Sequence, residues 1–223
     1  MRFERRAAGE ILQFWVFDVG PELEAALAEV GWEPREGGWA KSFHRPVPEQ
    51  AARALANIGH LLQPLLRQAA GAAAVPWEAA LETVCGRLKS GGLDWWLCGS
   101  AALAVRGVRL TPRDLDLVVA DADAIAVGDL LADGLIEPVC RAGWPISNWW
   151  GRAFLHARVE WIGGVTSAAD EPQATDFGPA AATRLEAVRW RAWQIRVPPL
   201  DLQRAVSARR GLAERVALID QLT

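Results

Sequence analysis

Two aspartates, Asp114 and Asp116, stand in the otherwise apolar segment Asp-Leu-Asp-Leu-Val-Val at residues 114–119. Its composition predicts a strand buried among other strands. Side chains at positions i and i+2 of a strand point to the same face, with Cα atoms roughly 6–7 Å apart. Two such carboxylates repel each other and lose hydration unless a cation lies between them. The pair therefore predicts either a magnesium site shared with substrate phosphates or a strand end at which both carboxylates face water.

A Gly-Ser turn precedes this segment. Residues 95–98 (Trp-Trp-Leu-Cys) predict a short strand that ends at Gly99-Ser100, and residues 101–106 predict a helix. Free N–H groups at the start of a helix attract phosphate, and a glycine lets the backbone approach it closely. The Ser100 hydroxyl can contact a phosphate oxygen or cap the helix. Turns of this kind also occur in folds that bind no ligand, so the turn alone leaves both interpretations open.

A third acid, Glu160, lies in residues 154–162, which predict another strand. On a neighbouring strand it would complete a three-carboxylate metal site and could act as base for an attacking hydroxyl. The alternative is a glutamate that faces solvent beside Arg158. Asp121 and Asp123 repeat the Asp-x-Asp spacing, but they precede a predicted helix, and we expect them to cap it.

Composition excludes several classes of protein. The chain has 223 residues, of which 51% are hydrophobic, and a net charge of -3, which argues against a protein that coats nucleic acid. No apolar run approaches the length of a membrane span, and no signal-peptide pattern is present. Cys85, Cys98 and Cys140 lack the paired spacing of a zinc site or a disulfide framework. We therefore expect a cytoplasmic protein that does not bind membranes.

The chain divides at an alanine-rich linker, residues 69–76. Before it, residues 11–17, 21–30, 32–43 and 49–68 predict a small β-α-β-β-α domain. After it, we expect helices at 77–89, 101–106, 122–132, 200–208 and 212–222, strands at 95–98, 114–119 and 154–162, and a hairpin at 184–197. The predicted domains are thus 1–75 and 76–223.

The order of these motifs resembles the nucleotidyltransferase superfamily with the DNA polymerase β-type core. The likeness rests on Gly99-Ser100 after a strand, a short helix, the Asp114-Leu-Asp116-Leu segment and Glu160. Small bacterial aminoglycoside and lincosamide enzymes, linked to antibiotic resistance, and nucleotidyltransferase components of toxin–antitoxin systems are the most similar members. The resemblance covers residues 77–222. It implies an α+β fold in which helices flank a mixed β-sheet core.

Two features depart from the family pattern. The third acid is glutamate rather than the commoner aspartate. The closing helices of relatives often carry a lysine and an Arg-x-Lys-Asp stretch, whereas this chain has Arg204, Arg209-Arg210 and Glu214-Arg215-Val216.

The resemblance implies roles for particular residues. Asp114 and Asp116 would hold two Mg²⁺ (or Mn²⁺) ions about 3.5–4 Å apart, with Glu160 as a further ligand and proton acceptor. Gly99 and Ser100 would fix the phosphates of an NTP, which we expect to be ATP. The remaining candidates, for neutralising pyrophosphate, are Arg106, Arg109 and Arg113. Arg113 could instead form a salt bridge with the acid pair.

The implied activity is transfer of a nucleoside monophosphate from an NTP to a hydroxyl, with release of pyrophosphate. The acceptor could be a small molecule such as an antibiotic, a protein side chain or an RNA end. The N-terminal domain would shape the acceptor side or an interface, in a homodimer or with a partner protein. The alternative is a catalytically silent module that binds a partner protein, as an antitoxin subunit does. We expect the tryptophans, including Trp149-Trp150, to fill the core rather than stack on a base.

Overall fold

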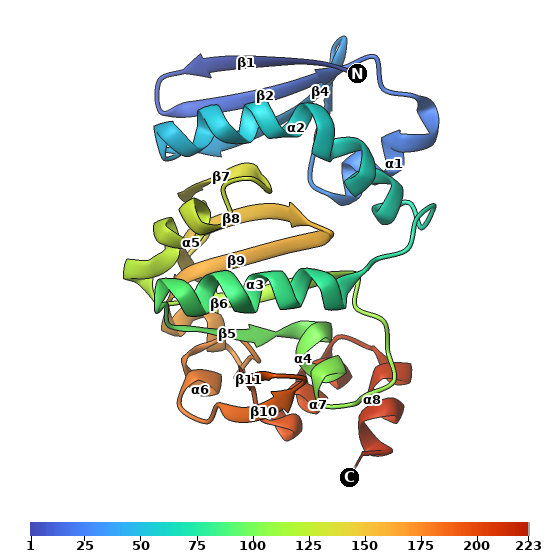
Figure 1. Ribbon diagram of the computed structural model, residues 1–223, viewed down its shortest axis with the longest axis vertical. Helices are drawn as coiled ribbons and strands as arrows, with labels where there is room; N and C mark the ends of the chain where they lie inside the picture. Colours follow the sequence, from blue (N-terminus) through green and yellow to red (C-terminus); the bar gives the residue numbers. More distant parts are fainter. Residues whose placement is uncertain (223) are drawn as a thin grey trace.

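The computed structural model describes residues 1–222. Three β-sheets follow one another along the long axis of the molecule, with the N-terminus at one end and the C-terminus at the other (Figure 1). Helices flank a mixed central sheet, which confirms the expected α+β class. Among residues 1–222, no helix combines the length and the apolar character that crossing a lipid bilayer would require.

The first sheet has the strand order β1-β2-β4-β3. Its strands are β1 (Arg2–Ala8), β2 (Ile11–Phe17), β3 (Glu33–Arg35) and β4 (Gly38–His44), and its helices are α1 (Pro21–Glu29) and α2 (Pro48–Ala69). The prediction lacked β1, so the β-α-β-β-α arrangement is wrong: β1 pairs antiparallel with β2 and makes it β-β-α-β-β-α. Because β1 is a charged, largely exposed edge strand, it shows no apolar alternation.

Helix α2 lies between this sheet and the central sheet, against its edge strand β7 (Leu135–Arg141) (Figure 1). The Asn57 side chain donates hydrogen bonds to the carbonyls of Ala132 and Leu135, at 2.8 and 2.9 Å. Gln50 accepts one from the Val139 N–H at 3.1 Å. One hydrophobic core includes buried residues from both predicted domains. The N-terminal unit, residues 1–75, is therefore packed firmly against the rest of the chain.

The central sheet has the order β5-β6-β9-β8-β7. Only β6 and β9 run parallel; the other neighbours are antiparallel. Helices α3 (Trp77–Gly91) and α5 (Ala124–Leu130) pack on the sheet, and α4 (Gly99–Val105) follows β5 directly. The remaining strands are β5 (Trp95–Cys98), β6 (Asp114–Val119), β8 (Ser147–Leu155) and β9 (Ala157–Val165).

The single strand predicted at 154–162 is wrong. The chain reverses at His156, in the left-handed region with φ 65°, so that β8 and β9 form an antiparallel hairpin. The composition hides this turn because apolar residues continue on both sides and neither glycine nor proline marks it. The helix predicted at 122–132 is also shorter: a 3₁₀ turn at Asp121–Asp123 precedes α5.

The C-terminal part lies beside β5 (Figure 1). The predicted hairpin and the two closing helices are confirmed. They are β10 (Glu186–Trp190), β11 (Trp193–Val197), α7 (Leu200–Arg209) and α8 (Ala213–Asp220). A 3₁₀ turn (Ser167–Asp170) and the short helix α6 (Pro179–Ala182) connect β9 to this hairpin.

Candidate active site

The three predicted acids come together on neighbouring strands. Asp116 of β6 stands opposite Glu160 of β9 in the parallel register, and Asp114 is two residues before Asp116 on the same face. One carboxylate oxygen from each of the three lies within 4.8 Å of the others. All three side chains are half-buried, and the intervening Leu115 packs in the core.

The electrostatics of this acid trio (Asp114, Asp116 and Glu160) favour a bound cation. Burial, followed by the charges of Asp114 and Glu160, raises the pKa of Asp116 to about 8. Burial alone would also raise the pKa of Glu160, but the charges of Arg152 and Arg158 outweigh it and hold that pKa below its usual value. Hard carboxylate oxygens in a converging set are the ligands that Mg²⁺ and Mn²⁺ prefer, so these residues fit a divalent ion.

Gly99 lies directly against this trio. Its φ is 64°, and a Cβ atom built there would stand 2.5 Å from Asp116 Oδ2. Its N–H donates to Asp176 Oδ2 at 3.4 Å, and its carbonyl accepts from the Gln203 side chain at 3.2 Å. The backbone conformation and the close approach both require glycine. The Gly99-Ser100 turn therefore packs directly against the Asp116 carboxylate and limits its position.

A cavity of about 630 Å³ opens beside the acid trio. We call it the first cavity. Gly99, Ser100, Trp150 and Phe177 line it together with the trio. Three arginines also line it: Arg209, Arg210 and Arg215. Its volume suits a nucleotide-sized ligand.

Two of those arginines form no close ion pair within residues 1–222. Among residues 1–222, no carboxylate lies within ion-pair distance of Arg210 or Arg215. Burial and the neighbouring charge of Arg210 lower the pKa of Arg215 below its usual value. Guanidinium groups that line a cavity without a close ion pair are suited to bind a polyphosphate.

A second cavity, of about 600 Å³, also borders Asp114. It shares Ser100, Asp114 and Arg215 with the first cavity. Glu29, Arg113, Arg158 and Glu214 supply further charges, and three leucines supply apolar surface. Glu29 is the last residue of α1, so the N-terminal unit forms part of this wall.

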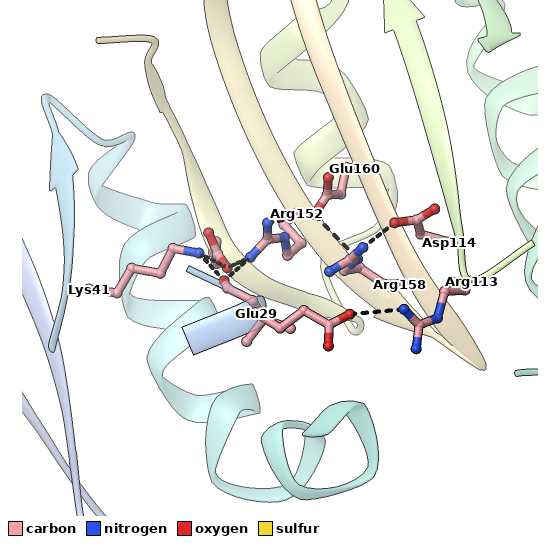
Figure 2. A network of polar contacts seen from close by, with 9 residues as sticks. Glu29, Lys41, Arg113, Asp114, Arg152, Arg158 and Glu160 are labelled. Atoms are coloured by element: carbon pink, nitrogen blue, oxygen red, sulfur yellow. Dashed lines mark hydrogen bonds and ion pairs between the residues drawn. The ribbon is translucent and has the colours of Figure 1, made fainter. Parts of the chain in front are cut away.

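The three predicted phosphate arginines do not line the first cavity. Arg106 donates to the Pro198 carbonyl at 2.6 Å and pairs with Glu186 at 2.7 Å. Arg109 is exposed, and its side chain donates to Gln221 at 3.3 Å. Arg113 pairs with Glu29 at 3.4 Å rather than with the acid pair, where Arg158 instead contacts Asp114 (Figure 2).

The arginines that do line this cavity were noted in the sequence only as departures from a family pattern. Asp176 was missed altogether, because it lies in an irregular segment with no neighbouring motif; it is buried, and burial raises its pKa. For the three arginines, the sequence signal is their clustering at positions 209, 210 and 215, around the end of α7 and the first turn of α8.

The remaining candidates lie outside the trio. Asp121 accepts a hydrogen bond from Asn148 and Asp123 from the Asp94 N–H, and neither caps a helix through its side chain. Trp149 and Trp150 both pack against the core as partly buried residues. Trp150 also lines the first cavity.

Comparisons with known proteins found structural similarity at low sequence identity. No family model and no curated protein matches it. A candidate nucleotidyltransferase from Thermotoga maritima is 18% identical, with a TM-score of 0.49 over 65% of this chain and 91% of that chain. The lincosamide antibiotic adenylyltransferase LnuA, with lincomycin bound, is 11% identical, with a TM-score of 0.47 over 64% and 96%. ANT(2″)-Ia in complex with adenylyl-2″-tobramycin is 14% identical, with a TM-score of 0.41 over 63% and 85%.

Proposed function

We propose that this protein is a nucleotidyltransferase that uses a divalent metal ion to move a nucleoside monophosphate from an NTP to an acceptor hydroxyl, releasing pyrophosphate. One observation carries the proposal. Three carboxylates converge within 4.8 Å at the wall of a cavity that also presents unpaired arginines. Carboxylates that hold a cation and arginines that hold phosphates are the two parts that phosphoryl-group transfer requires.

The acid trio would hold Mg²⁺ or Mn²⁺. When bound, such an ion polarises the α-phosphate and acidifies the acceptor hydroxyl. The lowered pKa of Glu160 keeps this carboxylate ionised, which suits a metal ligand better than a general base. Asp114 borders both cavities, so it would lie between the NTP in one and the acceptor in the other.

The charges of the lining residues support different roles for the two cavities. The first cavity combines Arg209, Arg210 and Arg215 with the Gly-Ser turn, so the triphosphate of the NTP, with ATP as the expected nucleotide, would lie there. The second cavity has balanced charges and apolar surface, which suits the acceptor. Acceptors of three classes remain to be separated by experiment: a small molecule, a protein side chain and an RNA end.

Label transfer tests the proposal. Wild-type protein is incubated with [α-³²P]ATP or [γ-³²P]ATP, Mg²⁺ and, in parallel, a panel of hydroxyl-bearing antibiotics, total RNA and total protein. The expected result is an α-labelled product in one acceptor class, with the γ label released in pyrophosphate. Failure to transfer label to any class, together with full biological activity of the Asp114→Asn/Asp116→Asn double variant, would instead support the silent, partner-binding module.

The rise in Tm that Mg²⁺ binding causes should depend on pH. Because the pKa of Asp116 is raised from 3.8 to about 8, the folded protein retains a proton that the unfolded chain has released between those pH values. Stability of the metal-free protein therefore falls as pH rises through this window. Metal binding must displace the proton, so the Mg²⁺-induced rise in Tm should be larger at about pH 8 than at about pH 6. A thermal melt series across pH checks this, and equal shifts at all pH values would contradict it.

Arg210→Ala should weaken nucleotide binding without harming the fold. Arg210 is exposed and repels Arg215, so its loss removes a phosphate contact while relieving unfavourable charge. We expect the Kd for ATP to rise about tenfold or more, since charge-assisted hydrogen bonds contribute about 1.5–3 kcal/mol each. Isothermal titration with Mg²⁺·ATP measures it. Arg184→Ala, which removes an exposed arginine paired with Asp201 outside the cavity, is the control, and equal Kd values for both variants would contradict the assignment.

A further inference from the structure

A row of charged side chains crosses the central sheet and ends at the acid trio. Glu137 of β7 stands opposite Arg152 of β8, and Arg152 stands opposite Glu160 of β9. Glu160 in turn stands opposite Asp116 of β6. Four adjacent strands therefore place one charged residue each at the same level of the sheet.

The N-terminal unit adds one more charge to this row. Lys41 of β4 reaches across towards Arg152 of the central sheet (Figure 2). Its Nζ donates to Glu137 Oε1 at 2.8 Å. Arg152 donates to the same Glu137 oxygen at 2.5 Å, and its other nitrogen, Nη2, lies 2.5 Å from Glu160 Oε1. Lys41 and Arg152 also both donate to the carbonyl of Val30, each at 2.7 Å. One guanidinium is thus shared between the N-terminal unit and Glu160.

These charges are buried deeply enough for each contact to matter. Lys41, Glu137 and Arg152 are 9%, 2% and 7% exposed. Glu137 Oε2 has no hydrogen-bond partner within residues 1–222, so the Glu137 charge depends on the two cations at Oε1. Buried ion pairs are seldom more stabilising than well-packed apolar side chains, so stability alone does not account for this row. The buried charges reach the acid trio through the contact of Arg152 with Glu160.

We propose that Lys41 is a positioning residue of the active site: by neutralising Glu137 it leaves Arg152 free to hold Glu160 in place for the metal ion. The inference rests on the proposed function, and it gives the N-terminal unit a direct part in that function. Without Lys41, Arg152 is the one cation that residues 1–222 leave beside Glu137, and Glu137 draws it away from Glu160. Groups that orient a metal ligand in this manner strongly affect metal affinity.

Whether loss of Lys41 weakens or tightens metal binding distinguishes a positioning role for Lys41 from a purely electrostatic effect of its charge. Lys41→Met makes the surroundings of the acid trio more negative, so a charge acting at a distance would tighten Mn²⁺ binding. Loss of positioning weakens it instead. We expect the Kd for Mn²⁺ alone, measured by electron paramagnetic resonance on the full-length chain, to rise about tenfold or more.

Three variants complete the experiment. Asn57→Ala removes two hydrogen bonds from the same interface without touching the row, so it should lower Tm and leave Mn²⁺ binding unchanged. Lys41→Met/Glu137→Gln removes one charge of each sign, which ends the competition for Arg152 and should restore the Kd to within about threefold of wild type. Lys41→Gln keeps a donor towards Glu137 and serves if Lys41→Met does not fold; it should weaken Mn²⁺ binding by a smaller factor.

The outcomes are distinct. Unchanged or tighter Mn²⁺ binding in a folded Lys41 variant would overturn the inference, as would a double variant that binds as weakly as Lys41→Met. Wild-type protein that binds Mn²⁺ no better than Asp116→Asn would count against the proposed function itself, because the acid trio would then hold no ion.

Discussion

Replacing Asp116 by asparagine should nearly abolish nucleotidyl transfer and at the same time stabilise the metal-free protein. The Asp116 carboxylate shares its site with two other acids, and burial and these charges raise its pKa to about 8. A metal centre contributes several kcal/mol to transition-state stabilisation, and about 1.4 kcal/mol is a factor of ten in rate, so the loss should be about a thousandfold or more. The amide removes both the repulsion and the cost of retaining a proton, so Tm without metal should rise.

The neighbouring Asp-x-Asp pair offers a matched control. Asp123→Asn makes the same chemical change seven residues after Asp116. The new asparagine side chain can still accept the hydrogen bond from the Asp94 N–H. We expect this variant to retain wild-type activity and Tm. Paired measurements of initial rate and of Tm in EDTA test both. An Asp116→Asn protein that keeps its activity would show that the trio does no metal chemistry.

Among substitutions that add one methyl group to the active site, Gly99→Ala should lower the activity most. The added Cβ would stand 2.5 Å from Asp116 Oδ2, and φ at this position is 64°. Either the turn or the carboxylate must shift, and displacement of a catalytic group by about 1 Å can lower the rate about a hundredfold. We expect loss of activity by about that factor and weaker binding of Mg²⁺·ATP, measured by initial rates and by titration calorimetry.

Gly92→Ala isolates the cost of the backbone conformation. Gly92 has φ 65°, almost the same as Gly99, but a Cβ there meets no atom within 4 Å. Both variants should lose about 1–2 kcal/mol of stability from the left-handed conformation. Only Gly99→Ala should also lose nucleotide binding. Equal activities in the two variants would mean that contact with Asp116 is unimportant.

The sequence predicted the acid trio because the relevant geometry is local. Strand periodicity alone places Asp114 and Asp116 on one face, and the apolar residues around them identify the strand. Glu160 required one further assumption, that its strand lies beside the first. The parallel pairing of β6 with β9 supplies it.

The residues that tertiary contacts bring to the site could not be predicted from the sequence. Arg106 and Arg109 are nearer in sequence to Asp114 and Asp116 than Arg210 and Arg215 are. It is nevertheless Arg210 and Arg215 that line the cavity, because residues of α7, α8 and the turn between them form part of its wall. Lys41 and Glu137 are 96 residues apart, and no local pattern marks a buried ion pair over such a separation. Proximity along the chain is therefore a poor guide to the arginines that line this cavity.

The most direct test of the central claim is nucleotide binding that requires both a divalent ion and Asp116. Thermal melts of wild type and Asp116→Asn are recorded with each NTP, with Mg²⁺ or with EDTA. Ligand at about 100 times its Kd stabilises a protein by about 2.7 kcal/mol, so we expect a clear rise in wild-type Tm with NTP and Mg²⁺ together. The rise should vanish in EDTA and in Asp116→Asn. Wild-type Tm values that are the same with and without every NTP and Mg²⁺ would contradict a metal-dependent nucleotide site.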